Sequence, residues 1–352
     1  MRHLGALAEV RVIAPRPSYS LRAEERSARV EDAAAAPIFP RAWYVPRVGS
    51  RVNHLLMAAS LRGPIARVKR DFPFDAVLAS WAYPDGCGVA ELARLSGFPF
   101  IVVAQGSDIH QYLGNPTRRR IILASLARAG AVVTRSEELA RLLREAGLPK
   151  EKVHVIYNGV DGEVFHARDR ADARTALGYA ATERVILYVG NLVPVKNPTL
   201  LVDAFSQLGD PNARLVIAGD GELKDALKAR ANERVSFVGR KPEREIAQLM
   251  RAADTLCVPS DNEGVPNVIL EAFACGLRVT ATRVGGIPEI VTEPQLGELV
   301  PKGDAMALST ALARSLAAPD RSSEIAAHAS RYTWQRTAAA YVALFEKLLA
   351  AR

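Results

Sequence analysis

The chain has 352 residues, 49% of them hydrophobic and 24% charged, which is the composition of a globular protein long enough for two domains. Its formal net charge of +8 is compatible with an anionic partner, such as a nucleotide or a membrane surface, and equally with a generally arginine-rich surface. No run of about 18 apolar residues occurs, so no membrane-spanning helix is expected. The three cysteines are far apart, without metal-binding spacing or a disulfide framework, which favours a reducing cytoplasm.

Short apolar runs with strand character alternate with longer amphipathic runs along the chain. The predicted strands cover 9–14, 75–80, 100–104, 131–134 and 153–157 in a first series, and 184–190, 214–219, 234–238, 254–258 and 278–281 in a second. Predicted helices between them include 84–95, 137–146, 200–208 and 222–231. This alternation predicts parallel sheets in an α/β fold.

The two series flank a hinge at 158–179, which predicts two doubly wound, Rossmann-like domains. The first domain is expected to cover 1–165 and to be joined by a C-terminal helix within 333–352. The second is expected to cover 166–332. Ligands of such sheets bind at the carboxyl ends of the strands, so the cleft between the domains is the expected site.

The beginning of the chain is unusual for a doubly wound domain. Residues 1–8 have the pattern of the end of a helix and lead directly into the predicted strand 9–14. We therefore expect a preceding strand, turn and partial helix upstream, over about 25–35 residues. The alternative is a domain that starts with the strand 9–14.

The segment from Glu263 to Glu271 places two carboxylates on either side of Pro266. Pro266 suits the first turn of a helix, so Glu263 is expected in the preceding loop and Glu271 two turns deeper. Such an arrangement can hold a sugar hydroxyl at one end and a ribose diol at the other. By itself the pair is weak evidence, because two glutamates at this spacing often arise by chance when 24% of residues are charged.

A second candidate site surrounds Lys196, between a predicted strand and a predicted helix. Gly190 allows a ligand to approach the backbone, and Pro198 suits the first position of the helix. Free N–H groups and the positive end of the helix then lie beside Lys196, which predicts a diphosphate site. Taken alone, Lys196 is more simply explained as a surface lysine. Farther along, Gly285 and Gly286 are expected to bring backbone close to the bound ligand.

These segments, in this order, resemble the retaining glycosyltransferases of family GT4, which have the GT-B fold of two Rossmann-like domains. The resemblance is most specific from Gly190 to Glu289 and extends over nearly the whole chain. Gly106–Asp108, Asn158–Asp161 and Tyr332–Trp334 are also typical of the family.

The resemblance implies a role for each matching residue. Glu271 would accept hydrogen bonds from the ribose, Lys196 would stabilise the leaving diphosphate, and Arg240 would lie by the base. Glu263 would lie by the donor sugar. The residues implied at the reaction centre are Glu263, Lys196, Gln105 and Asp108. Those implied in donor binding are Gly190, Asn191, Lys196, Arg240, Glu263, Gly264, Val265, Pro266, Asn267, Val268 and Glu271.

The chain departs from the family pattern at two positions. Asn191 stands where the family often has arginine, so the charge of the leaving group depends more on Lys196 and on helix N-termini. Gln105 stands where a histidine is common, and an amide can hold a hydroxyl but cannot take up a proton. The family's first-strand glycine loop is not found in the sequence.

The resemblance implies sugar transfer from a nucleoside diphosphate to an acceptor hydroxyl, with no metal or other cofactor. A glycan or a lipid-linked acceptor, in cell-surface polysaccharide or glycolipid synthesis, would bind the first domain. The protein would be cytoplasmic, with possible peripheral contact at the inner membrane face. A nucleotide-sugar epimerase of the same fold and a catalytically silent nucleotide-sugar binder are the alternatives. Nucleic acid is not an expected partner, because the run Arg118–Arg120 has no interleaved aromatic platform.

Overall fold

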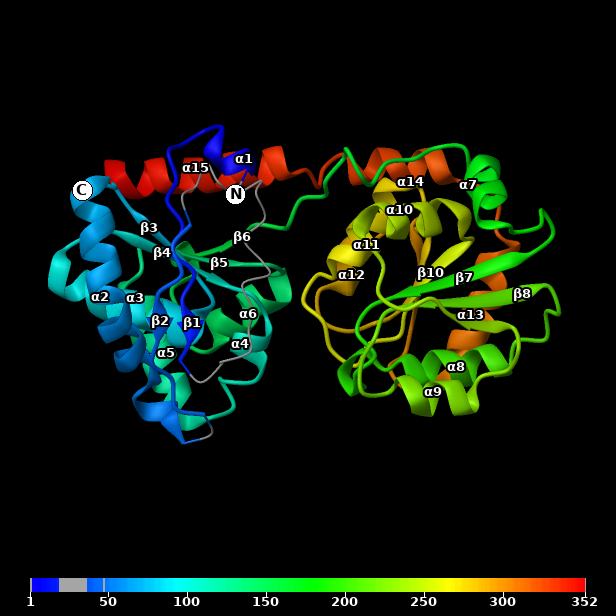
Figure 1. The fold of residues 1–352 in the computed structure, drawn as a ribbon, viewed down its shortest axis with the longest axis horizontal. Coiled ribbons are helices and arrows are strands. Elements are labelled where there is room, and N and C mark those ends of the chain that lie inside the picture. The colour runs from blue at the N-terminus through cyan, green and yellow to red at the C-terminus, as the bar shows by residue number, and fades with distance from the viewer. Residues whose placement is uncertain (1, 19–36, 47, 352) are drawn as a thin grey trace. The chain divides into compact units, whose positions relative to one another are not determined.

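The computed structural model of the protein describes residues 2–18, 37–46 and 48–351. The chain forms two compact units (Figure 1): Met1–Tyr157 with Gln335–Arg352, and Asn158–Trp334. Residues 158–165, which the sequence assigned to the first domain, therefore belong to the second unit.

The first unit contains a parallel sheet with the strand order β3-β4-β5-β6. Its strands are β3 (Val77–Ser80), β4 (Phe100–Ala104), β5 (Ala131–Thr134) and β6 (Val153–Val155). Every residue of β4 is buried, as expected for a parallel strand covered on both faces. Alternate side chains of β4 pack on opposite faces of the sheet: Phe100 and Val102 belong to one apolar cluster, and Ile101 and Val103 to another.

Helices cover both faces of this sheet. On one face lie the helices α2 (Asn53–Asp71), α3 (Cys87–Ser96) and α5 (Pro116–Arg128). The same side also carries the shorter elements η4 (Ala82–Gly86), α4 (Ser107–His110) and α6 (Glu137–Glu145). On the other face α15 (Trp334–Ala350) packs Tyr341 against Ile101 and Val133. Figure 1 shows α15 in red along the sheet, beside the short helix α1 (Arg2–Gly5).

The predicted strand 9–14 is wrong. Only Ile13 pairs there, in an isolated bridge with Ile38, and the short strands β1 (Arg16–Pro17) and β2 (Arg41–Ala42) follow. They form a separate sheet and do not join the main one. The apolar alternation of 9–14 reflects packing over the domain: Ile13 contacts the core cluster that contains Phe100 and Val102.

The second unit contains a parallel sheet with the order β12-β11-β10-β7-β8-β9. Its strands are β7 (Arg184–Val189), β8 (Ala213–Ala218), β9 (Val235–Phe237), β10 (Thr255–Val258), β11 (Val279–Thr282) and β12 (Gly297–Val300). From β7 the chain first builds outward to β9 and then returns to the other side of β7 with β10. The neighbours β7 and β10 therefore form the topological switch point, where such sheets bind ligands.

Helices lie on both sides of this sheet in Figure 1, with α8, α9 and α13 on one side and α10, α11 and α14 on the other. The bounds are α7 Arg170–Leu177, α8 Pro198–Ser206, α9 Lys224–Arg230, α10 Glu243–Ala252, α11 Asn267–Ala274, α12 Ile287–Ile290, α13 Ala305–Ala317 and α14 Ser322–Ala329. At the edge of the unit the backbone of Val160 donates to the carbonyl of Tyr332 at 3.0 Å. The chain thus enters and leaves the second unit through two adjacent segments.

Candidate donor-binding site

A cavity of about 530 Å³ lies at the switch point of the second unit. Its walls come from the end of β7, the end of β10, the start of α11 and the loop after β9. Most of the predicted donor-binding residues line it: Gly190, Asn191, Lys196, Arg240, Glu263, Pro266, Asn267, Val268 and Glu271. Gly264 and Val265 are not part of the lining, although they lie in the same turn.

Lys196 and Glu263 form a direct ion pair in this cavity. The Lys196 Nζ lies 2.6 Å from Oε1 and 2.7 Å from Oε2 of Glu263. The sequence predicted both residues for the site but not this contact. The Glu263 side chain is 9% exposed and that of Lys196 34%, so the carboxylate side is covered while part of the lysine side chain stays open to solvent.

Ser260 is a site residue that the sequence reasoning missed. Its hydroxyl donates to Oε1 of Glu263 at 2.7 Å, and its own carbonyl accepts from the buried hydroxyl of Thr282 at 2.5 Å. The available signal was its position, because Ser260 stands two residues after the end of β10, at the carboxyl edge of the sheet. Ser260 therefore orients the carboxylate that faces Lys196.

Gly285 and Gly286 hold the turn that carries Glu263. The N–H of Gly286 donates to the carbonyl of Gly264 at 3.0 Å. A Cβ on Gly285 would lie 1.7 Å from the carbonyl oxygen of Glu263, and the φ of Gly285 is +52°, which disfavours other residues. The sequence predicted that these glycines approach a ligand, whereas in the structure they approach the neighbouring turn.

Glu271 lies on α11 with its carboxyl group largely buried at the cavity wall. Burial raises its pKa to about 7, and the negative charge of Glu243 adds to the shift. Within the described ranges no hydrogen bond to the Glu271 carboxylate is found. The group is therefore desolvated and available to accept hydrogen bonds from a ligand.

The ligand-free protein should lose stability as pH rises through the range set by Glu271. Its pKa is raised from 4.5 to about 7, so the folded state binds more protons than the unfolded state between these values. Glu271→Gln removes this penalty, and we expect the variant to be more stable than the parent protein by up to ~3 kcal/mol near pH ~8. Urea unfolding at several pH values measures the difference. If the difference in stability between the two proteins were the same below pH ~4 and above pH ~8, the raised pKa of Glu271 would be contradicted.

Asp108 and Gln105 belong to the first unit and have different surroundings. Asp108 is fully buried and accepts from the backbone N–H groups of Ala82 at 2.6 Å, Gln105 at 3.0 Å and Gly106 at 2.9 Å. This geometry fixes two loops to each other. Gln105 donates through Nε2 to the Ser80 hydroxyl at 2.9 Å, which holds the amide at the carboxyl edge of the sheet.

The described residues offer neither a metal site nor an exposed thiol. In those ranges no group of three histidine, cysteine or acidic side chains is placed to hold a metal ion. The three cysteines are free and buried. No described helix is long and apolar enough to cross a membrane.

Two protein-family models together match nearly the whole chain. Residues 1–164 match the description Glycosyltransferase Family 4, and residues 169–332 match Glycosyl transferases group 1. The chain belongs to glycosyltransferase family 4. Its two Rossmann-like units are those of the GT-B fold.

Curated relatives of this family 4 chain include D-inositol 3-phosphate glycosyltransferases of mycobacteria. The protein of Mycobacterium ulcerans is 32% identical over 234 residues, which cover 62% of this chain and 50% of the relative. That of Mycobacterium bovis is also 32% identical over 234 residues, 48% of its length. The chain thus spans about half the length of the curated relatives it matches.

Solved structures with the same fold include two that cover most of this chain. Sucrose-phosphate synthase from Thermosynechococcus elongatus has a TM-score of 0.78 and 24% identity, over 90% of this chain and 84% of that one. Anabaena HepE in complex with UDP has a TM-score of 0.74 and 22% identity, over 91% of this chain and 88% of that one. These identities establish the fold alone.

Proposed function

We propose that this family 4 protein is a retaining glycosyltransferase that moves a sugar from a nucleoside diphosphate to an acceptor hydroxyl. The observation that carries the proposal is the cavity at the switch point of the second unit, with the Lys196 ammonium and the desolvated Glu271 carboxylate on its walls. A cation suits the diphosphate, and a carboxylate with free acceptor capacity suits the ribose diol.

The donor that we propose to test first is a UDP-sugar. The fold relative HepE has been solved with UDP and with UDP-glucose. In this chain the loop after β9, with Arg240, lines the same cavity as Glu271. The nucleobase would lie on that side, and the sugar would lie toward Glu263 and the start of α11.

The reaction would break the bond between the anomeric carbon and the diphosphate oxygen, and the acceptor oxygen would bond to the same face of that carbon. The acceptor proton would pass to the leaving phosphate. Lys196 would stabilise the charge that develops on the diphosphate, and Ser260 would keep Glu263 oriented toward the sugar. Gln105 would position a hydroxyl, since an amide cannot accept the proton. In this proposal the chain needs no metal.

The acceptor, we propose, is a glycan or a lipid-linked sugar that binds the first unit, in the synthesis of a cell-surface polysaccharide or glycolipid. The protein would work in the cytoplasm, with peripheral contact at the membrane. The formal charge of +8 supports contact with an anionic leaflet.

A thermal-shift screen with UDP-, GDP- and ADP-sugars tests donor binding. We expect one of the three nucleotides to raise the melting temperature by several degrees at saturation, because ligand at about 100 times Kd adds ~2.7 kcal/mol. Glu271→Ala should remove most of the shift, whereas Glu222→Ala, at an exposed position of the same unit, should keep it. The proposal fails if none of the nucleotides changes the melting temperature.

Nucleotide release distinguishes an enzyme from a silent binder. A transferase should release UDP slowly from a UDP-sugar in water and faster when a suitable acceptor is added. Binding without any release, under conditions that saturate the site, would favour the silent nucleotide-sugar binder.

A further inference from the structure

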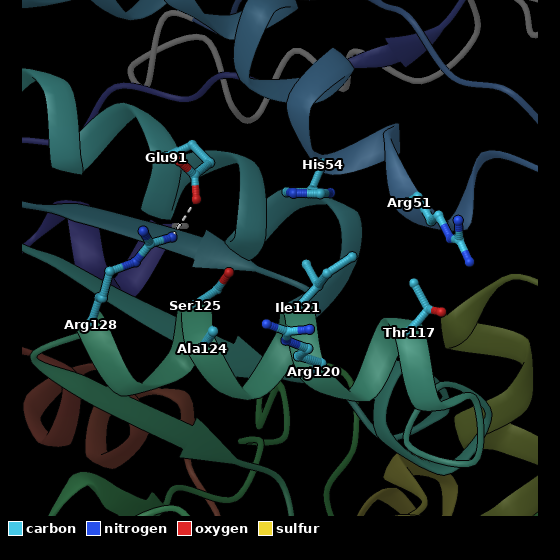
Figure 2. Close-up of a pocket in the computed structure, with 9 residues that line it drawn as sticks. All are labelled: Arg51, His54, Glu91, Thr117, Arg120, Ile121, Ala124, Ser125 and Arg128. Atoms are coloured by element: carbon cyan, nitrogen blue, oxygen red, sulfur yellow. Dashed lines mark hydrogen bonds and ion pairs between the residues drawn. The ribbon is translucent and has the colours of Figure 1, made fainter.

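A second cavity, of about 470 Å³, lies in the first unit between helices α2, α3 and α5. Figure 2 shows its lining, with the side chains of α5 below and those of the α2 and α3 region above. Among the lining residues are Arg51, His54, Glu91, Thr117, Arg120 and Arg128. We call this cavity the helix groove. It belongs to a different unit from the donor cavity.

The helix groove carries an excess of positive charge. Its one acidic residue, Glu91, is already paired with Arg128, whose Nη2 lies 2.5 Å from Oε1 (Figure 2). Although burial opposes the charge of Glu91, the hydrogen bond from Arg128 holds the pKa of this carboxyl below its usual value. Arg51 and Arg120 have no ion pair with a described residue. Two guanidinium groups are thus left without an anion in the described part of the groove.

The run Arg118–Arg120 divides its side chains between different surroundings. The guanidinium of Arg118 stacks on Tyr112, 4.4 Å from the ring centroid, and Arg119 is exposed. Arg120 alone of the three lines the groove. Arg120 is exposed too, so only Arg118 of the run is partly buried.

His54 supplies a second, independent indication of a ligand. Its side chain is 9% exposed, and its Nδ1 is buried without a hydrogen-bond partner among the described residues. Burial lowers the pKa of His54, and Arg128 adds to this shift against the opposing charge of Glu91, so the ring is neutral near pH ~7. Figure 2 shows the ring between Arg51 and the pair Glu91–Arg128. A buried polar nitrogen left unpaired is unfavourable, and a ligand in the groove would relieve it.

We propose that the helix groove binds the phosphate group of a ligand. Arg51 and Arg120 provide planar guanidinium donors for phosphate oxygens, and Thr117, in the first turn of α5, provides a hydroxyl. His54 donates or accepts one further hydrogen bond. The phosphate belongs either to a soluble phosphorylated molecule or to an anionic lipid headgroup. Exposed apolar side chains near Arg51 fit the lipid source, since Val48 and Val52, on either side of it in the sequence, are 81% and 43% exposed.

Two probes separate these sources in experiments on the full chain. Isothermal titration with inorganic phosphate and glycerol 3-phosphate measures binding of a soluble phosphate. Sedimentation with phosphatidylcholine vesicles, with and without phosphatidylglycerol, measures binding of a lipid phosphate. The test variant is Arg51→Gln with Arg120→Gln. The matched control is Arg67→Gln with Arg119→Gln, which removes the same charge from exposed positions of α2 and α5 outside the groove.

We expect at least one probe to bind the parent protein and to bind the test variant ~10-fold or more weakly, with the control variant close to the parent. His54→Gln, which keeps the net charge, should weaken the same probe. Binding of the soluble phosphates assigns a soluble ligand, and binding only of vesicles with phosphatidylglycerol assigns a lipid. The proposal is overturned if neither probe binds, or if both double variants lose binding equally. The thermal shift with nucleotide sugars reports the donor cavity separately, so failure of one proposal is distinguishable from failure of the other.

Discussion

Lys196→Ala should slow the release of UDP from a UDP-sugar by ~10²–10³-fold in kcat, the range found when one donor to a developing negative charge is removed. In the cavity of the second unit the Lys196 ammonium is the cation bound to Glu263, and the Lys196 side chain remains 34% exposed. Its removal takes away a positive charge beside the proposed leaving group and leaves the buried Glu263 carboxylate with Ser260 as its described hydrogen-bond donor. Steady-state kinetics at saturating donor measures the effect.

Lys224→Ala is the matched control for this substitution. Lys224 lies in the same unit, has a side chain 33% exposed and pairs with Asp220 at 3.3 Å, but it does not line the cavity. We expect its kcat to stay near the parent value. Lys196→Arg keeps a positive charge and should retain more activity than Lys196→Ala. Equal rates for the two alanine variants would exclude a role for Lys196 in the reaction.

Gly285→Ala should destabilise the protein by ~2–4 kcal/mol and weaken donor binding as well. The new Cβ would lie 1.7 Å from the carbonyl oxygen of Glu263, and neither backbone can move without displacing the turn that carries Glu263. The left-handed φ of +52° adds strain for any residue with a Cβ. Urea unfolding measures the loss of stability, and the thermal shift with a nucleotide sugar measures the loss of binding.

Gly303→Ala separates the effect of the close contact from the effect of the positive φ. Gly303 has a φ of +76°, but a Cβ there would meet no atom within 4 Å. We therefore expect only the conformational penalty at this position, ~1 kcal/mol, with donor binding unchanged. A Gly285→Ala variant no less stable than Gly303→Ala would show that the contact with Glu263 does not constrain the turn.

Local sequence pattern predicted the regular elements of the sheets well. The bounds of β4 and β5 agree with the prediction to the residue, because short apolar runs between polar turns leave little freedom in where a buried strand can lie. Strand β12 was missed, because Gly297 and Glu298 interrupt the apolar pattern of this short edge strand. The strand predicted at 9–14 failed for the opposite reason, because apolar alternation also arises when an irregular segment packs on a domain.

The identities of the cavity residues could be predicted, but their contacts could not. The motif around Lys196 and the turn with Glu263 are 67 positions apart in sequence, and no local pattern states that the two side chains bind each other. The same holds for Gly285 and the carbonyl of Glu263. The helix groove could not be predicted either, because it depends on how α2, α3 and α5 pack together. The sequence patterns of the separate helices do not specify this packing.

The path of the chain through the two units has a consequence for biosynthesis. Because α15 packs Tyr341 on the strands that contain Ile101 and Val133, the second unit is in effect an insertion within the first. A ribosome makes the whole of Asn158–Trp334 before the helix that covers the first sheet emerges. The second unit can acquire its native structure during translation, while the first unit keeps an apolar surface uncovered until α15 has been made.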